Sequence, residues 1–445
     1  MRKTGITTAA AALVLLCGCT QQEIGPMFEM SDFPMTLNSD CSALVDISTS
    51  EQGKTRGTRY ETIEDLRADA IGIYCLPARK INKNAENIVF NRFIQYDENG
   101  DLINTNGVYW DNLKFTLGEA YGTGGKYRLI KTLDSHDPLF DFYPLPSNYG
   151  YDFYGYAPYQ EGTADNPVNI YYRDQYLAVD FAIDGTQDIV HGQSVTPDDA
   201  AEYPSYYSAK YFRDTKKASA VDMKFSHKLV KFNFNVIPRP ATIKDVNGNL
   251  PEEDDYTGVD SLAVKSIRFV NTKDSVQMII AAEESYMNRL HNPEYAKYNP
   301  DFGPGYIQGL NKVTTATFHL HKRNSEGVWE VPDTLVHISH ERAMKEDPIN
   351  QRIKVGEYMM VYPTNLYTME VELCSKNNPE IVFPKSILRV ERIENGNRLK
   401  FKGGSQYNIN IHVEGSTAIN VISAELVDWE DGDENGDDVE INYFD

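Results

Sequence analysis

The stretch LVKFNFNV, residues 229–236, alternates apolar and polar side chains with a period of two. Its even-numbered residues, from Val230 to Val236, are all apolar, whereas Lys231 and two asparagines stand between them. This period predicts a β-strand with one buried face. The same pattern predicts further strands at 261–270, 313–321, 357–362, 407–413 and 420–429.

Turn signals separate the strand-like runs. Asn-Gly, which favours two-residue hairpin turns, occurs at 99–100, 106–107, 247–248, 395–396 and 435–436. Helical pattern is confined to short stretches near 61–70, 198–203 and 340–346. We therefore predict an all-β fold of two tandem antiparallel β-sandwiches with few short helices. We expect the join near residue 216, so that residues 19–215 form an N-terminal domain and residues 216–445 a C-terminal domain.

The N-terminus has the three-part layout of a secretory signal. A basic pair at residues 2–3 precedes a run of small and apolar residues at 8–16, and LCGC at 16–19 ends the run. The run is too short to cross about 30 Å of hydrocarbon as a helix. The Leu-x-Gly-Cys order resembles the bacterial lipobox. We therefore predict that residues 1–18 are a signal peptide and that Cys19 is lipidated and anchors the mature chain in the outer membrane; the alternative is an ordinary cleaved signal.

Composition excludes several classes of protein. The chain has 65 acidic and 43 basic residues and a formal charge of −22. Such a charge repels nucleic acid and anionic membrane surfaces, so neither is expected as a partner. After Cys17 leaves and Cys19 is acylated, three of the five cysteines remain, without any Cys-x-x-Cys. Cys75 and Cys374 lie in strand-like runs and are expected to be buried free thiols.

The chain shows little sign of catalytic or metal chemistry. His319 and His321, together with His337 and His340, could form a metal site, but polar strand faces are the favoured interpretation. Nucleophile elbows, phosphate loops and zinc-protease motifs are absent from the sequence, and no spacing selects a catalytic carboxylate pair. We therefore expect a protein that is not an enzyme, with no catalytic residues, no metal and no cofactor.

Residues 431–437 (DGDENGD) resemble the start of a calcium-binding loop. Asp431, Asp433 and Asn435 occupy its first, third and fifth positions. The twelfth position is Asn442, however, where such a loop needs a bidentate glutamate. An acidic hairpin turn is the favoured interpretation, and calcium binding is the alternative.

Tyrosines gather at residues 142–159 and 203–211. Such residues commonly form strand faces and pack around hairpins. The alternative is an exposed aromatic platform that binds glycans. That alternative would make the chain a glycan-binding surface lipoprotein of the outer membrane.

The order of segments resembles the fimbrillin family, the type V pilus subunits of Bacteroidales, and especially its Mfa-like lipoproteins. The segments that carry the resemblance are LCGC at 16–19, ALVDIS at 43–48, Thr-Arg at 55–56 and 58–59, IGIYC at 71–75, GVYWDN at 107–112, YDFYGYAPY at 151–159, QDIVHG at 187–192, MKFSHKLVKFNFNV at 223–236, VKSIRFVN at 264–271, FKGGSQYNINIHV at 401–413 and SAELVDW at 423–429. The chain departs from the family pattern at His191 and in long insertions at 280–312 and 324–334. Those departures leave its position in a pilus, whether stalk, accessory or tip, open.

The resemblance implies two transthyretin-like sandwiches and assembly by strand exchange. In such a process an arginine-specific protease cuts after Arg56 or Arg59, and the strand at 43–48 leaves. A donor strand from a neighbouring pilus subunit then fills the groove, and the fibre mediates adhesion to a host or bacterial receptor. The run at 420–445 is a candidate donor. The alternative is that Arg56 and Arg59 are solvated linker charges.

Overall fold

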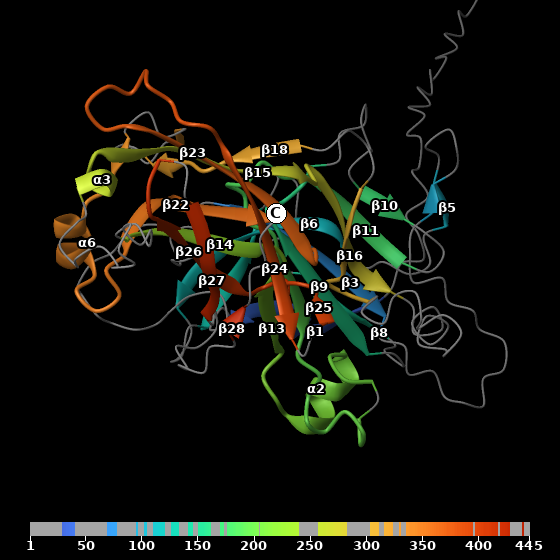
Figure 1. The fold of residues 1–445 in the computed structure, drawn as a ribbon. Coiled ribbons are helices and arrows are strands. Elements are labelled where there is room, and N and C mark those ends of the chain that lie inside the picture. The colour runs from blue at the N-terminus through green and yellow to red at the C-terminus, as the bar shows by residue number, and fades with distance from the viewer. Residues whose placement is uncertain are drawn as a thin grey trace, which may run out of the picture.

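The computed structural model in Figure 1 describes most of the chain in separate ranges. These are residues 29–40, 69–77, 95–96, 102–104, 110–120, 126–132, 141–145, 150–161, 170–172, 176–203, 205–239, 257–282, 303–310, 316–323, 329–330, 335–394, 397–416, 419–427 and 438–439. Strands dominate these ranges, and the helices are short: α2 (Ala209–Thr215), α3 (Thr257–Asp260) and α6 (His340–Glu346). None of the described helices has the length and apolarity needed to span a bilayer.

Seven strands of the N-terminal half close into a barrel in the order β12-β13-β2-β7-β6-β3-β9. Their bounds are β2 Thr36–Asp40, β3 Ile71–Pro77, β6 Trp110–Ala120, β7 Lys126–Lys131, β9 Tyr151–Ala157, β12 Val190–Ser194 and β13 Ala220–His227. Apolar side chains such as Ile73, Phe115, Phe153 and Phe225 fill the interior. Closure leaves the barrel without an edge strand.

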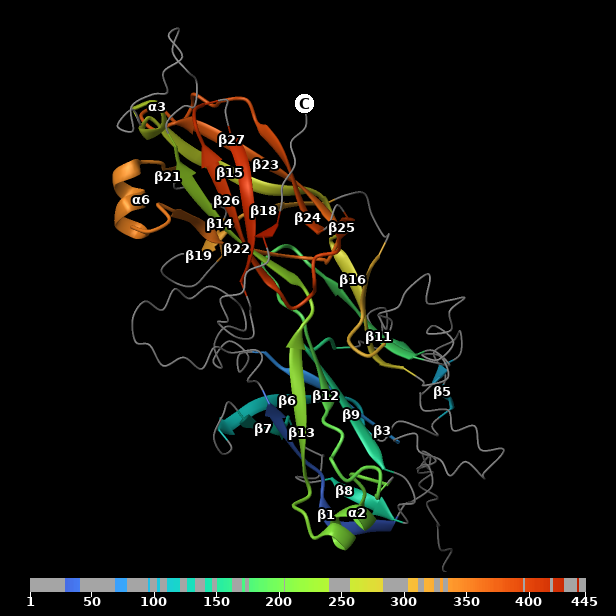
Figure 2. The ribbon, with the colours of Figure 1, turned by 60° about the horizontal axis from the view of Figure 1, so that its bottom comes forward.

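Two small strand pairs lie outside the barrel ladder. Strand β1 (Glu29–Pro34) pairs with β8 (Phe142–Leu145), and β4 (Gln95–Tyr96) pairs with β5 (Leu102–Asn104). Figure 2 shows β1, β8 and α2 together at the lower end of the molecule, away from α3 and α6.

Two larger sheets form the C-terminal half. One has the order β22-β14-β26-β27-β28 and the other the order β18-β15-β23-β24-β25, with β21 also pairing with β15. Their bounds are β14 Val230–Pro238, β15 Leu262–Thr272, β18 Ala316–His319, β21 Val336–His337, β22 Ile353–Val361, β23 Leu366–Ser375, β24 Ser386–Glu394, β25 Asn397–Leu399, β26 Gln406–Val413, β27 Ile419–Val427 and β28 Asp438–Val439, and a separate pair joins β19 (Lys322–Arg323) to β20 (Trp329–Glu330). The aromatic side chains of Phe232, Phe269 and Tyr367 interlock between the two sheets.

A four-stranded sheet, β10-β11-β16-β17, joins the two halves. Its bounds are β10 Ile170–Tyr172, β11 Tyr176–Ala182, β16 Ser275–Ala282 and β17 Ile307–Gly309. Strand β11 precedes the expected join at 216, and β16 follows it. Their antiparallel pairing therefore joins the N-terminal and C-terminal parts of the chain in one sheet. A continuous apolar cluster runs from Tyr74 and Tyr156 of the barrel wall to Phe232 in the C-terminal half.

Strands β3 and β9 are buried on both faces. Ile73 and Phe153 point into the barrel, whereas Tyr74 and Tyr156 contribute to the cluster shared with the C-terminal half. Gly72 allows this close packing, because an added Cβ would lie 2.3 Å from a ring carbon of Tyr156. Burial on both sides explains why these segments are apolar or aromatic almost throughout and do not alternate.

The strands predicted from period two are present at all six stretches. Strand β14 buries Val230, Phe232, Phe234 and Val236 completely. Strands β24 and β25 pair with Glu394 opposite Asn397, as expected for a hairpin around the Asn-Gly at 395–396. Of the helices expected, α6 is confirmed; residues 198–202 form turns instead, and most of 61–70 lies outside the described ranges.

The expectation of wholly antiparallel sheets is wrong at two pairs. Strand β2 runs parallel to β13, and β14 runs parallel to β26. The second pair carries polar ladders on one face, in which Asn233 donates to Asn408 over 3.0 Å and Asn235 to Asn410 over 3.2 Å. Alternation of side chains between two faces is the same for either direction of pairing, so the sequence pattern does not report it.

Candidate functional site

Strand β2 occupies an unusual place in the barrel. It lies between β13, with which it is parallel, and β7, with which it is antiparallel. It is also the first barrel strand in the chain, and the next, β3, begins only at Ile71. A single cut in the connection at 41–70 would therefore separate β2 from every other barrel strand.

The inner face of β2 fits the barrel core. Leu37 is 2 % exposed and stands between Val221 of β13 and Leu129 of β7. Ser39 is fully buried, and its register neighbours are Met223 and Tyr127. Burying a leucine side chain contributes about 1.5–3 kcal/mol. Removal of β2 would therefore expose apolar surface together with unpaired backbone groups on both neighbours.

The outer face of β2 is polar and crossed by an ion pair. Lys126 of β7 lies 2.8 Å from the carboxylate of Asp222 on β13, so the pair spans the strand between them. Asn38 of β2 donates from its amide nitrogen to the same Asp222 carboxylate over 3.1 Å. This arrangement leaves Asn38 only 5 % exposed although it faces outward.

Chain upstream of β2 is held by β8 and α2. The amide of Met35 donates to the carbonyl of Asp141 over 2.7 Å. The Phe33 ring packs against the Phe212 ring of α2 at a centroid distance of 6.4 Å. Ser208 caps α2 by accepting from the Tyr211 amide over 3.1 Å.

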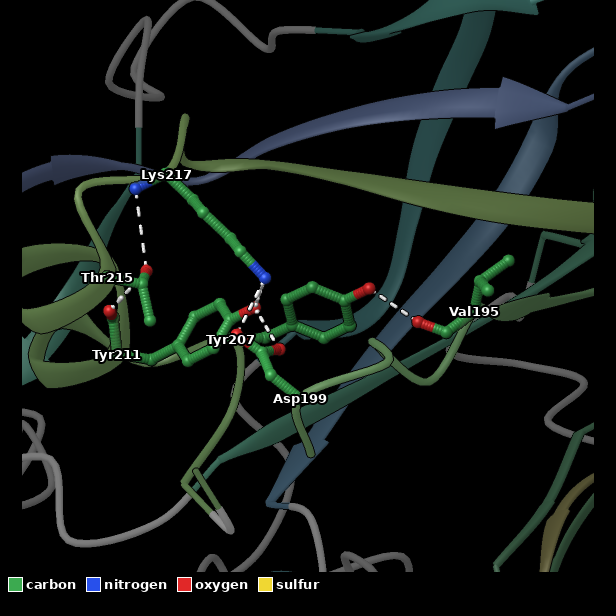
Figure 3. A network of polar contacts seen from close by, with 6 residues as sticks. All are labelled: Val195, Asp199, Tyr207, Tyr211, Thr215 and Lys217. Carbon is green, nitrogen blue, oxygen red and sulfur yellow. Dashed lines mark hydrogen bonds and ion pairs between the residues drawn. The ribbon is translucent and has the colours of Figure 1, made fainter. Parts of the chain in front are cut away.

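A polar network fixes α2 to the loop before it (Figure 3). Lys217 donates to Asp199 over 2.7 Å and to the Tyr211 hydroxyl over 2.9 Å, and that hydroxyl donates to the other Asp199 oxygen over 2.9 Å. Tyr207 donates to the carbonyl of Val195. Hydrogen bonds from Lys217 and Tyr211 lower the pKa of Asp199, which keeps that carboxylate charged. The network orients the surface against which Phe33 packs.

A second polar cluster lies where β13 leads into β14. Asp188 and His227 are both fully buried, and His227 Nδ1 donates to Asp188 over 2.6 Å. The other carboxylate oxygen of Asp188 accepts from the Ile189 amide over 2.7 Å. These two residues belong to QDIVHG at 187–192 and to MKFSHKLVKFNFNV at 223–236, so the pair adds a buried side-chain contact between segments that the β12–β13 ladder also joins.

His191, the departure from the family pattern, is buried beside that cluster. Its Nε2 donates to the carbonyl of Ile280 on β16 over 2.9 Å, which links the barrel to the four-stranded sheet. Burial, and secondarily the charge of Lys228, lowers the pKa of His191 to about 3. The side chain is therefore a neutral hydrogen-bond donor at neutral pH.

This burial predicts a loss of stability in mild acid. In the unfolded chain His191 binds a proton near its ordinary pKa of about 6.5, whereas in the fold it stays neutral down to about pH 3. Stability from this group is therefore complete above pH 6.5 and is lost as the pH falls towards 3, with about 2 kcal/mol lost at pH 5. Urea unfolding between pH 7 and pH 5 measures the slope.

His191→Gln is the matched variant, because glutamine keeps a donor near Nε2 but does not titrate. We expect its unfolding free energy to depend less on pH than that of the wild type. His412, whose pKa burial lowers to about 4, acts in the same direction and is retained in both proteins. Parallel pH profiles for the two proteins would contradict the role of His191.

Most of the site residues predicted from the sequence lie outside the described ranges. Cys19, Arg56, Arg59 and the strand expected at 43–48 lie outside the described ranges, as do Asp431, Asp433 and Asn435. Among the described residues upstream of the two arginines, the barrel strand is β2 at 36–40, which was not predicted from the sequence. A signal was available in MTLNS, where apolar and polar residues alternate, but the run is short.

The candidate donor run at 420–445 is partly engaged in its own sheet. Strand β27 pairs with β26 from Ile419 to Val427, and β28 pairs with β27. The described part of this run therefore belongs to the C-terminal half of the same chain.

The four-histidine alternative does not assemble into a metal site among the described residues. His319 and His337 pair with Arg268 and Ala263, well separated along β15. The described residues contain no group of three His, Cys, Asp or Glu side chains placed to hold a metal ion. Cys75 and Cys374 are buried free thiols, as predicted.

The tyrosine platform is wrong for most of the described tyrosines in the two runs. The buried ones, at most 8 % exposed, are Tyr143, Tyr151, Tyr154, Tyr156, Tyr206, Tyr207 and Tyr211. They pack on one another and on phenylalanines, as in the Tyr143–Phe212 pair at 5.1 Å. Tyr151, Tyr154 and Tyr156 are buried on strand β9, and the others pack in the same apolar cluster as α2, so these side chains offer no flat exposed surface to a sugar.

The fold and the slot around β2 define an all-β protein whose first barrel strand is joined to the rest by one connection. Over nearly its full length the chain matches solved structures of Bacteroidales proteins linked to cell adhesion and fimbriae. A presumed cell adhesion protein from Bacteroides uniformis is 14% identical over 89% of this chain and 99% of its own, with a TM-score of 0.40.

Two further structures show the same extent of match. A presumed cell adhesion protein from Bacteroides ovatus is 12% identical over 90% of this chain and 98% of its own, with a TM-score of 0.38. The fimbrial anchor protein Mfa2 from Porphyromonas gingivalis is 8% identical over 92% of this chain and 100% of its own, with a TM-score of 0.29. No protein-family model matches the chain, and no curated protein matches its sequence.

Proposed function

We propose that this chain is a structural subunit of a cell-surface pilus that mediates adhesion. It is exported as a lipoprotein anchored through Cys19 and assembled by strand exchange after proteolysis at Arg56 or Arg59. In this proposal the two larger sheets of the C-terminal half form a transthyretin-like sandwich, whereas the N-terminal half is a closed barrel in place of the first sandwich expected from the sequence. The barrel would then accept a donor strand from a neighbouring subunit in the place of β2.

The observation that carries the proposal is the position of β2. It is hydrogen-bonded on both sides, yet chain connects it to the barrel only through the segment that contains Arg56 and Arg59. One cut there frees the strand covalently, while its hydrogen bonds and Leu37 still hold it in place. The ordered motifs of the sequence support the same interpretation.

The physical consequence of losing β2 is specific. Strands β13 and β7 become edges with unpaired N–H and C=O groups beside an apolar slot, and such edges bind an added strand. An incoming strand restores both ladders and covers the core. After the exchange, therefore, no additional surface is exposed to water, and one subunit is linked to the next.

Cleavage of the purified precursor with an arginine-specific protease tests the proposal. We expect a cut at Arg56 or Arg59, found by mass spectrometry, followed by oligomer ladders that resist SDS. The Arg56→Ala/Arg59→Ala variant should keep its N-terminal segment and stay monomeric. Arg213→Ala, which removes an exposed arginine from α2, is the matched control and should behave as the wild type. Nicked protein that stays monomeric under all conditions would refute strand exchange for this chain.

A further inference from the structure

We propose that the slot between β13 and β7 selects the incoming strand by its polar outer face. The partner is a β-strand of another subunit with four consecutive residues of a defined kind. They are an apolar residue, an amide, a small residue and an acidic residue, in the places that Leu37, Asn38, Ser39 and Asp40 occupy in β2. This inference rests on the proposed strand exchange and adds the chemistry by which the slot recognises its partner.

The amide position is defined by Asp222. One oxygen of this carboxylate accepts from Asn38 over 3.1 Å, and the other binds Lys126 over 2.8 Å. An incoming strand with an amide at this position restores the bond to Asp222 below the same ion pair. A carboxylate there would instead face Asp222 at short range, and like charges opposite each other on neighbouring strands destabilise a sheet.

The acidic position is defined by two lysines. Lys224 of β13 and Lys126 of β7 stand opposite Asp40 in the two ladders. Arg128, opposite Asn38, adds a third cation on the two strands that line the slot, whose own sequences contain one carboxylate, Asp222. The slot rim is thus locally positive in a chain whose formal charge is −22. A strand with an acidic residue at the fourth position complements that rim.

The inner face sets the size of the remaining residues. Ser39 is fully buried in register with Met223 and Tyr127. Interiors pack closely, so a large side chain at this position forces its neighbours to move. The slot therefore accepts a small residue between its amide and acidic positions.

Competition between two peptides on the nicked full-length protein tests the selection. The wild-type peptide covers residues 29–44, and its competitor carries Asp40→Lys. The two peptides are mixed in equal amounts, both in excess over the protein. Mass spectrometry then gives the ratio of the two peptides bound in place of the cleaved segment. We expect the wild-type peptide to be favoured on the order of tenfold, because the substitution places a lysine opposite Lys126 and Lys224, and like charges opposite each other destabilise a sheet. The preference should weaken as salt is added.

A peptide with Asp32→Lys is the matched control. It makes the same change in net charge at an exposed position of β1. It should compete within about twofold of wild type, since exposed charges away from a partner contribute little. On protein carrying Lys126→Glu and Lys224→Glu, the Asp40→Lys peptide should now be favoured over the wild-type peptide.

The outcomes separate the two proposals. Charge selection is wrong, and strand exchange stands, if the wild-type peptide enters the slot but the Asp40→Lys and Asp32→Lys peptides compete with it equally well. The same conclusion follows if the doubly substituted protein does not prefer the Asp40→Lys peptide. If no peptide is incorporated at all, strand exchange itself fails and the selection falls with it.

Discussion

A Phe232→Ala variant is expected to lose about 3–5 kcal/mol of unfolding free energy. Phe232 is fully buried between the two C-terminal sheets. Its ring centroid lies 5.1 Å from that of Tyr367 and 5.3 Å from those of Phe269 and Phe401. Alanine leaves a cavity in this aromatic cluster, and the surrounding rings belong to both sheets, so they cannot all close on it. Urea denaturation followed by tyrosine and tryptophan fluorescence measures the loss.

Phe232→Leu is the graded control for this variant. Leucine keeps much of the volume and all of the apolar character, so we expect a loss well below that of alanine. Equal losses in the two variants would show that the aromatic contacts, rather than the cavity, set the stability. A loss below about 1 kcal/mol for alanine would contradict the placement of Phe232 at the centre of the core.

A His227→Ala variant is expected to lose about 3–5 kcal/mol as well, for an electrostatic reason. His227 and Asp188 are completely buried, and each is a hydrogen-bond partner of the other. Removing the imidazole leaves the Asp188 carboxylate with only the Ile189 amide. A buried charge without its partner costs far more than an exposed one. The measurement is again the unfolding free energy in urea at neutral pH.

Two controls identify the source of that loss. His227→Asn keeps a donor near the Nδ1 position and should recover part of the stability. The double variant Asp188→Leu/His227→Leu removes both polar groups, and we expect it to be more stable than His227→Ala. If the double variant loses as much unfolding free energy as Asp188→Leu and His227→Leu lose together, the two residues act independently and do not form a coupled pair.

The same strand connects this pair to the slot. Strand β13 carries Asp222, which binds the outer face of β2, and ends at His227, which binds Asp188. Loss of the buried pair therefore removes an anchor at one end of a slot wall. The His227→Ala variant should exchange β2 more readily than Phe232→Ala does, because Phe232 lies beyond the barrel on β14.

Several features followed from residue patterns alone. The even-numbered apolar residues of 229–236 form the buried face of β14, because alternation maps directly onto the two faces of a strand. Cys75 and Cys374 lie in strands as buried thiols, as their apolar neighbours indicated. The hairpin at 395–396 followed from Asn-Gly, whose backbone preferences match a two-residue turn.

Other features depend on partners far away in the chain. The helix α2 was missed because Ala209–Thr215 is short and polar, and its burial against Phe33 joins residues remote in sequence. The tyrosines of β9 suggested either packing or an exposed platform. Their burial on both faces exists only because β9 lies between the barrel interior and the cluster shared with the C-terminal half.

For the six alternating stretches, the sequence by itself determined that they form strands and which of their faces are apolar, since that information lies in the alternation of neighbouring side chains. Only the tertiary structure decided that β2 fills the barrel between β13 and β7, and that two pairs run parallel. The physical reason is that a strand's own pattern specifies a buried face but not a neighbour. Register, direction and partner are set by hydrogen bonds and packing between segments that the chain brings together only on folding.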